Sequence, residues 1–213
     1  FYAYIHDNLP VGKRLVLKAG ARINMVTSNP KLFFEPRLSA TYKFNEQIKL
    51  NASWGLYNQF MYKIANVDKD QNYSYLWITS NKKIPVLNAQ HLAGGLNYFK
   101  NDLTINVETY YRLTRNLTQR VFEPRFNHES RSDGYYPYFG DAKTYGIDFY
   151  AKKDFRKHSV WASYTLSQAL ERFAQKNMAL PAYRLAPQHQ QHEFKLAALF
   201  NIGKFYLSAN YVY

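Results

Sequence analysis

The chain alternates between apolar and polar residues along segments of about ten residues each. In the clearest segment one row of alternate positions reads Leu103, Ile105, Val107, Thr109, Tyr111 and Leu113. A period of two places successive side chains on opposite faces, which is typical of a β-strand and not of a helix. The stretch from His158 to Phe205 contains two more such segments, joined by a long polar loop and followed by a tight turn. We therefore predict strands with one apolar and one polar face.

About ten strands are predicted, and short turns alternate with longer loops between them. We expect the short turns at Asn8 to Gly12, Asn45 to Gln47, Lys100 to Asp102, Asp154 to Lys157 and Asn201 to Lys204. We expect the longer connections at Thr27 to Glu35, Met61 to Val86, Asn116 to Asp141 and Glu171 to Gln188. Outer-membrane barrels combine short periplasmic turns with longer extracellular loops. The pattern predicts an all-β fold, a transmembrane antiparallel β-barrel with its longer loops outside.

Composition agrees with this interpretation. Aromatic residues make up 18% of the chain, and large rings pack well on a pleated sheet. The mean hydropathy is −0.50 and no run of about 18 apolar residues occurs, which excludes a transmembrane helix. A soluble β-sandwich is the alternative, but its packed core gives no reason for loop lengths to alternate. It would also have to bury the charges of the predicted inward row, namely Arg22, Lys43, Lys49, Glu108, Asp148, Glu193 and Lys195.

Charge and cysteine content limit the possible partners. The chain has 28 Lys and Arg against 15 Asp and Glu, a net charge of +13, and no Cys. Such a charge can indicate nucleic-acid binding. Here the cations are dispersed over loops and polar rows, so we expect lipid phosphate or an anionic solute instead, and no nucleic acid. Both chain ends carry strand pattern and no secretory signal precedes the first strand, so we expect a fragment.

Two groups of residues suggest a metal site and an enzyme active site, and we reject both interpretations. His189, His192 and Glu193 have a spacing that suits a helix, but the stretch reads as a loop entering a strand. His158 and Ser159 with a nearby acid suggest a hydrolase, but adjacent strand residues point to opposite faces. We therefore expect no enzyme activity, no metal and no cofactor.

The candidate ligand-binding residues are aromatic and basic residues of the longer loops. The aromatic ones could stack on sugar or chelate rings, or pack against their own loops: Tyr73, Tyr75, Trp77, Tyr135, Tyr136 and Tyr138. The basic ones could bind solute or lipopolysaccharide phosphate, or be solvated loop charge: Lys82, Lys83, Arg120, Arg125 and Arg131. His189 and His192 complete this predicted set at the barrel lip.

Several motifs, in this order along the chain, resemble one known family. These are PRLSATYKFNEQIKLNASWGLYNQF, IPVLNAQHLAGGLNYF, FGDAKTYGIDFYAKK and SYTLSQALERF, followed by YRLAPQHQQHEFKLAALFNIGKFYLSANYVY. They are similar to the barrel of TonB-dependent outer-membrane receptors, in the branch with a carboxypeptidase-like regulatory domain. The resemblance implies a 22-stranded barrel around an N-terminal plug, of which residues 1–213 would be less than half. The plug, the N-terminal strands and the final strands would be absent. One departure is His189, where relatives commonly carry Asp.

The resemblance also implies a mechanism and a location. The receptor would lie in the outer membrane of a Gram-negative cell and bind its solute between outer loops and plug. The inner-membrane TonB complex would then pull the plug. Expected partners are the TonB complex, the plug, lipopolysaccharide or another outer-membrane lipid, the solute and a possible surface lipoprotein. Iron chelates, cobalamins, oligosaccharides and peptides are the candidate solutes. A passive porin and a structural barrel subunit of a larger complex are the alternative functions.

Overall fold

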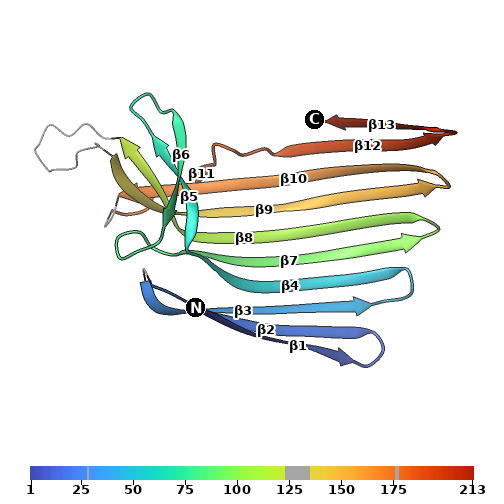
Figure 1. Ribbon diagram of the computed structural model, residues 1–213, viewed down its shortest axis with the longest axis horizontal. Coiled ribbons are helices and arrows are strands. Elements are labelled where there is room, and N and C mark those ends of the chain that lie inside the picture. Colours follow the sequence, from blue (N-terminus) through green and yellow to red (C-terminus); the bar gives the residue numbers. More distant parts are fainter. Residues whose placement is uncertain (28, 123–134, 176–177) are drawn as a thin grey trace, which may run out of the picture.

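The computed structural model describes residues 1–27, 29–122, 135–175 and 178–213, and every regular element in them is a β-strand (Figure 1). The strands are β1 (Tyr2–Val11), β2 (Leu15–Val26), β3 (Asn29–Lys43), β4 (Ile48–Gln59), β5 (Met61–Val67), β6 (Tyr73–Thr79), β7 (Leu87–Lys100), β8 (Leu103–Phe122), β9 (Tyr135–Phe155), β10 (His158–Gln175), β11 (Arg184–Leu185), β12 (His192–Ile202) and β13 (Phe205–Val212). In the described ranges no helix is long and apolar enough to cross a membrane.

Ten strands form the body of one sheet, in the order β1-β2-β3-β4-β7-β8-β9-β10-β12-β13. Each neighbouring pair in this order is antiparallel. Figure 1 shows the strands side by side, with β1 and β13 at the two edges. The prediction of an all-β, antiparallel fold with about ten main strands is confirmed.

The connections between the strands fall into two groups, one at each end of the sheet. Five turns of two to four residues lie at one end of the sheet, at residues 12–14, 44–47, 101–102, 156–157 and 203–204 (Figure 1). At the opposite end, which we call the long-loop end, β4 ends and β7 begins, β8 ends and β9 begins, and β10 ends; the described residues 60–86 and 178–191 leave the main strands there. At the turn between β7 and β8 both central residues have positive φ, 48° for Asn101 and 60° for Asp102. This backbone matches the twist of the flanking strands, which makes a two-residue hairpin favourable.

Two predicted boundaries near the N-terminus are wrong. The turn expected at Asn8 to Gly12 lies at residues 12–14, because β1 continues through Pro10 to Val11. The loop expected at Thr27 to Glu35 is also wrong, because β3 already begins at Asn29.

The apolar rows meet in register across the whole sheet. Directly paired positions on successive strands from β1 to β12 form one line: Val11, Leu15, Tyr42, Leu50, Leu96, Val107, Phe149, Tyr164 and Phe194. Leu50, Leu96 and Phe149 are 41%, 38% and 42% exposed. Paired residues share a face, so one face of the sheet, called the outer face here, is apolar and uncovered.

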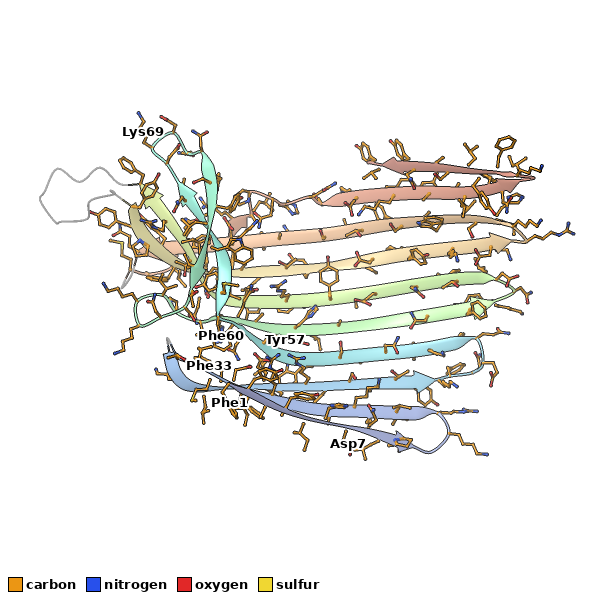
Figure 2. The ribbon with its side chains drawn as sticks, in the orientation of Figure 1. Phe1, Asp7, Phe33, Tyr57, Phe60 and Lys69 are labelled. Carbon is orange, nitrogen blue, oxygen red and sulfur yellow. The ribbon has the colours of Figure 1, made fainter. Side chains whose placement is uncertain are left out.

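The opposite face, called the inner face, is polar. One line across it pairs Lys49, Asn97, Asn106, Tyr150, Ser163 and Lys195. Asn97 donates to Asn106 Oδ1 over 2.9 Å, and Lys195 pairs with Glu193 at 2.7 Å. Figure 2 shows side chains along the whole length of the main strands. An apolar outer face and a polar inner face are the arrangement of a barrel wall around a wet or filled lumen.

The three longest of the predicted loops, Met61 to Val86, Asn116 to Asp141 and Glu171 to Gln188, contain more strand than expected. Residues 61–86 include the β5–β6 hairpin, which runs across the direction of the main strands at the long-loop end (Figure 1). β8 and β9 continue to Phe122 and from Tyr135, and β10 continues to Gln175. β11 pairs with Leu170 and Glu171 of β10, on the edge that β12 leaves free. These segments extend the sheet at the long-loop end, beyond the residues where all the main strands are paired with their neighbours.

The buried cluster of the described residues lies at this hairpin and not across the sheet. Tyr62, Ile64 and Leu87 are 3%, 2% and 7% exposed. Leu76, Ile78, Ile84 and Leu117 pack against them. The ten main strands thus have no packed sandwich core in the described part of the chain, which argues against the soluble alternative.

Candidate functional site

The β5–β6 hairpin continues the wall of the sheet beyond the end of β7. The β7–β8 register ends at the pair Asn88 and Arg115, and a bulge follows at Asn116, which has a φ of 62°. Beyond the bulge the free edge of β8 pairs in parallel with β5, from Gln119 opposite Ala65 to Val121 opposite Val67. The hairpin is therefore part of the sheet and is held at the long-loop end.

Hydrogen bonds fix the base of the hairpin. The Tyr62 hydroxyl donates to the Pro85 carbonyl over 2.8 Å and lies 3.3 Å from Thr118 Oγ1. Asn116 Nδ2 donates to the Val86 carbonyl over 2.9 Å. Burial raises the pKa of the Tyr62 hydroxyl, so this group stays protonated and remains a donor at neutral pH.

The hairpin carries a row of aromatic side chains on the face opposite this buried base. Tyr73, Tyr75 and Trp77 pair with Val67, Ala65 and Lys63. Because Ala65 lies opposite Gln119 of β8, this row belongs to the inner face. The three rings are 42%, 63% and 60% exposed, and Lys63 Nζ lies 5.6 Å from the Trp77 ring centre. We call Tyr73, Tyr75 and Trp77 the aromatic row.

Two cavities lie between the hairpin and the parts of β8, β9 and β10 at the long-loop end. One has a volume of about 630 Å³, and its lining includes Tyr73, Gln119, Tyr138, Phe173 and Arg184. The other, of about 290 Å³, is lined in part by Tyr73, Tyr75, Gln119 and Phe173. The two share Tyr73, Gln119 and Phe173, so together they form one hollow region, which we call the mouth. Figure 2 shows Lys69, which lines the larger cavity, at the tip of the hairpin.

Cations outnumber acids in the lining of the mouth. The larger cavity has Lys69, Arg172 and Arg184 with Asp68, and the smaller has Lys63 and Arg112 with Glu171. Glu171 pairs with Arg184 at 3.7 Å. Hydrogen bonds from the side chain and backbone of Asn72 lower the pKa of Asp68, which keeps this carboxylate charged at neutral pH. The remaining cations favour an anionic or partly anionic ligand.

The structure brings five of the predicted ligand-binding residues together. Tyr73, Tyr75 and Tyr138 line the mouth, and Trp77 lies on the same hairpin face. Tyr136 pairs with Val121, another lining residue, so it shares the inner face. The predicted aromatic residues thus come from two segments that are far apart in the sequence, β6 and the start of β9.

Other predicted residues lie elsewhere. The guanidinium carbon of Arg120 lies 5.1 Å from the centre of the Tyr135 ring. Both residues occupy strand positions next to those of the inner face, so their side chains lie on the other face of the sheet. Lys82 and Lys83 are exposed in the loop after β6. Arg125 and Arg131 lie outside the described residues.

The two predicted histidines do not join the aromatic row. His189 Nδ1 accepts a hydrogen bond from the Ala169 amide over 3.3 Å, just beyond the lining residue Gln188. His192 lies opposite Leu166 on the outer face, where its Nδ1 is 2.8 Å from the Tyr164 hydroxyl. Among the described residues no group of three or more His, Asp or Glu could hold a metal ion.

The residues considered for a hydrolase are engaged separately. Ser159 Oγ donates to Asp154 Oδ1. His158 Nδ1 instead accepts from the Asn201 amide over 3.1 Å, and its ring lies 5.7 Å from Phe200. His158 and Ser159 therefore do not form a base and nucleophile pair here.

Sequence reasoning missed several residues of the mouth. Lys63, Arg112, Glu171, Phe173 and Arg184 line the two cavities but were not predicted as site residues. Arg112 could have been found from its place in the polar row of β8. Glu171 and Arg184 meet only because β11 returns onto β10, and their separation of 13 residues gives no local signal.

Comparison with known proteins gives a consistent result. The family model for "TonB dependent receptor-like, beta-barrel" matches residues 1–213. No curated protein matches the sequence. Two solved structures are similar in fold: the alcaligin outer-membrane receptor FauA from Bordetella pertussis, and the siderophore receptor PirA from Acinetobacter baumannii. The first has a TM-score of 0.60 and 18% identity, covering 98% of this chain and 36% of that one. The second has a TM-score of 0.58 and 11% identity, covering 99% and 38%. The chain thus spans well under half the length of these receptors.

Proposed function

Because this chain belongs to the family of TonB-dependent receptor-like β-barrels, we propose that it forms part of the barrel of an outer-membrane receptor that imports a solute. The solute would bind at the mouth, and TonB-coupled movement of a plug would release it inward. The observation that carries this proposal is the convergence of Tyr73 and Tyr75 of the aromatic row with Tyr138 at two cavities at the long-loop end. An external solute would meet this end first, since longer loops lie outside in such barrels.

The side chains of the mouth suit a solute that combines rings with negative charge. Tyrosine and tryptophan offer large, rigid contact areas and lose little conformational entropy on binding. Lys63 and Arg112 add positive charge beside Tyr75 in the smaller cavity. A cation-rich recess also raises the local concentration of an anionic solute and speeds its association. Iron chelates and acidic oligosaccharides have this chemistry, and cobalamins and peptides complete the set to be screened.

The polar inner face supports the second half of the proposal. A plug that fills the lumen would form hydrogen bonds with Asn97, Asn106, Ser163 and their neighbours on the inner face. Such polar contacts can be broken and remade with modest changes in free energy, because water replaces the lost partner. TonB would supply the pull, because binding alone cannot move a solute against its gradient.

The test uses the complete receptor in a Gram-negative host, exposed in turn to labelled iron chelates, cobalamins, oligosaccharides and peptides. We expect one class to bind and to accumulate in energised cells. Dissipating the proton gradient should stop accumulation and leave surface binding in place. Flux that continues unchanged without the gradient would show a passive porin. Binding of a surface lipoprotein without flux of any solute would show a structural subunit.

A further inference from the structure

The strand β6 has one edge without a backbone partner in the described part of the chain. β6 pairs with β5 alone, and β5 uses its other edge for the parallel pairing with β8. The local strand order is therefore β8-β5-β6, and β6 ends this part of the sheet. An edge strand presents a row of backbone N–H and C=O groups that can pair with another extended chain.

The hydrogen bonds of the hairpin decide which residues of β6 face this free edge. Along an antiparallel ladder, pairs that exchange backbone hydrogen bonds alternate with pairs that do not. The Asp68 N–H donates to the Asn72 carbonyl over 3.1 Å, and at the other end of the hairpin the Ser80 N–H donates to the Phe60 carbonyl over 2.7 Å. By this alternation the even-numbered residues of β6 face β5. The backbone groups that point to the free edge are those of Tyr73, Tyr75, Trp77 and Thr79.

β6 lacks the features that keep an exposed edge from pairing. Proteins protect such edges with charged residues, proline, bulges or very short strands. The sequence of β6, YSYLWIT, contains neither charge nor proline, and its register with β5 runs without a bulge over all seven residues. Most of these residues are aromatic or β-branched, which favours an extended backbone. The free edge of β6 is therefore suited to the addition of a further strand.

The position of this edge favours the imported solute as the added strand. Tyr73 lines both cavities of the mouth and Tyr75 lines the smaller one, which also contains the cations Lys63 and Arg112. Directly paired residues of neighbouring strands share a face. Every second side chain of a strand added to β6 would thus lie beside the aromatic row, on the inner face.

The backbone of the free edge selects among the solute classes. Of the classes to be screened, only a peptide carries N–H and C=O groups at the spacing of a β-strand. At about 3.4 Å per residue, an extended peptide of about seven residues matches β6 in length. The carboxylates of such a peptide would also meet the positive charge of the mouth.

We propose that the solute is an extended peptide that adds a strand to β6, with its backbone paired to Tyr73, Tyr75 and Trp77. The inference rests on the proposed function, because it names the solute class that the mouth would take. In strand addition the backbone hydrogen bonds provide affinity for many sequences, and contacts to alternate side chains provide specificity. The aromatic row and the neighbouring cations would supply these contacts.

The test uses the complete receptor purified in detergent and a pool of random heptapeptides, from which a binding peptide is selected. Two derivatives of this peptide carry N-methyl groups, one at its odd and one at its even positions. In an added strand one of these sets of N–H groups points at β6 and the other points away. One derivative should therefore bind about tenfold more weakly, and the other should bind as the parent peptide does. Equal loss in both, loss in neither, or a pool without a binding peptide would overturn the proposal.

Hydrogen exchange at single-residue resolution locates the bound peptide. Binding should slow exchange of the Tyr75 and Trp77 amides and leave the Leu76 amide, which already faces β5, nearly unchanged. Thr79→Pro removes one N–H from the free edge and should weaken binding, whereas the matched control Thr79→Ala keeps this N–H and should bind the peptide as the wild type does. Heat-dependent gel migration checks that both variants fold. Slowed exchange of these amides with a second receptor copy or a surface lipoprotein, and not with the peptide, would overturn the proposal.

Failure of this inference differs from failure of the proposed function. Gradient-dependent accumulation of an iron chelate, a cobalamin or an oligosaccharide, without peptide binding, would overturn the peptide assignment and leave import intact. Peptide binding that depends on which N–H groups are methylated, without accumulation in energised cells, would support pairing at β6 and overturn import.

Discussion

The hydroxyl of Tyr62 lies 3.3 Å from Thr118 Oγ1, joining the β5–β6 hairpin to the wall strand β8. The same hydroxyl donates to the Pro85 carbonyl. Tyr62→Phe removes this donor from the part-buried carbonyl of Pro85. We expect the hairpin to lose about 1 kcal/mol of local stability, seen as faster amide hydrogen exchange in β5 and β6 while β9 and β10 are unchanged.

A matched control exists on the same hairpin. Tyr75→Phe also removes one hydroxyl, but this side chain is 63% exposed. It should leave exchange in β5 and β6 as in the wild type. Equal acceleration by both variants would mean that the Tyr62 hydroxyl does not hold the hairpin.

The second prediction concerns which end of the sheet faces outward. The chain has no Cys, so single cysteines can be introduced against a clean background in this region. Lys82→Cys, in the loop after β6, should react with a membrane-impermeant maleimide on intact cells. Glu46→Cys, in the turn between β3 and β4, should react only after the outer membrane is permeabilised. The reverse order of labelling would invert the assigned topology.

The third prediction separates the two faces of one strand. Ile105 pairs with Ala151 on the outer face, and its neighbour Thr104 pairs with Lys152 on the inner face. Ile105→Arg should destabilise the folded barrel by about 2–4 kcal/mol if the position lies near the bilayer midplane, and less toward an interface. Thr104→Arg should cost much less, because the inner face already carries charge. Urea titration of the receptor in liposomes measures both, and equal losses would contradict a lipid-facing outer row.

The fourth prediction concerns pH at the tip of the hairpin. The Asp68 pKa is lowered from 3.8, chiefly by hydrogen bonds from Asn72. A lowered folded-state pKa means that the carboxylate supports the turn above its unfolded pKa, and this support is lost as pH falls through the folded value. Relative to Asp68→Ala, amide exchange at Asn72 should be slowed above pH 4 and converge with the variant at lower pH. A constant ratio over this range would exclude the carboxylate as the cause.

The main strands could be predicted from the sequence because the side-chain period of two decides which face each residue occupies. Phe149 and Tyr164 fall on one face by parity alone, and the register pairs them directly. The hairpin could not be predicted in the same way. Its strands bury Tyr62 and Ile64 on one face and carry Tyr75 and Trp77 on the other, so apolar and polar residues do not alternate.

The candidate site, too, could be predicted only in part. The aromatic residues within 73–77 and 135–138 could be predicted because they cluster in two connections that belong to the same end of a barrel. Their separation into inner and outer faces could not, because the bulge at Asn116 shifts the parity of β8 between Arg115 and Leu117. This shift turns Arg120 away from the mouth and Gln119 toward it.

The central claim is that the aromatic row binds the solute, and the most direct measurement compares two tyrosine variants of the complete receptor. Tyr75 lies at the mouth, and Tyr206 lies at the opposite end of the sheet, just after the turn at residues 203–204; both are well exposed. With the solute found by the uptake screen, Tyr75→Ala should weaken binding to intact cells about tenfold, which corresponds to about 1.4 kcal/mol. Tyr206→Ala should bind as the wild type does, with equal amounts of folded receptor. Unchanged affinity in Tyr75→Ala would contradict a binding site at the mouth.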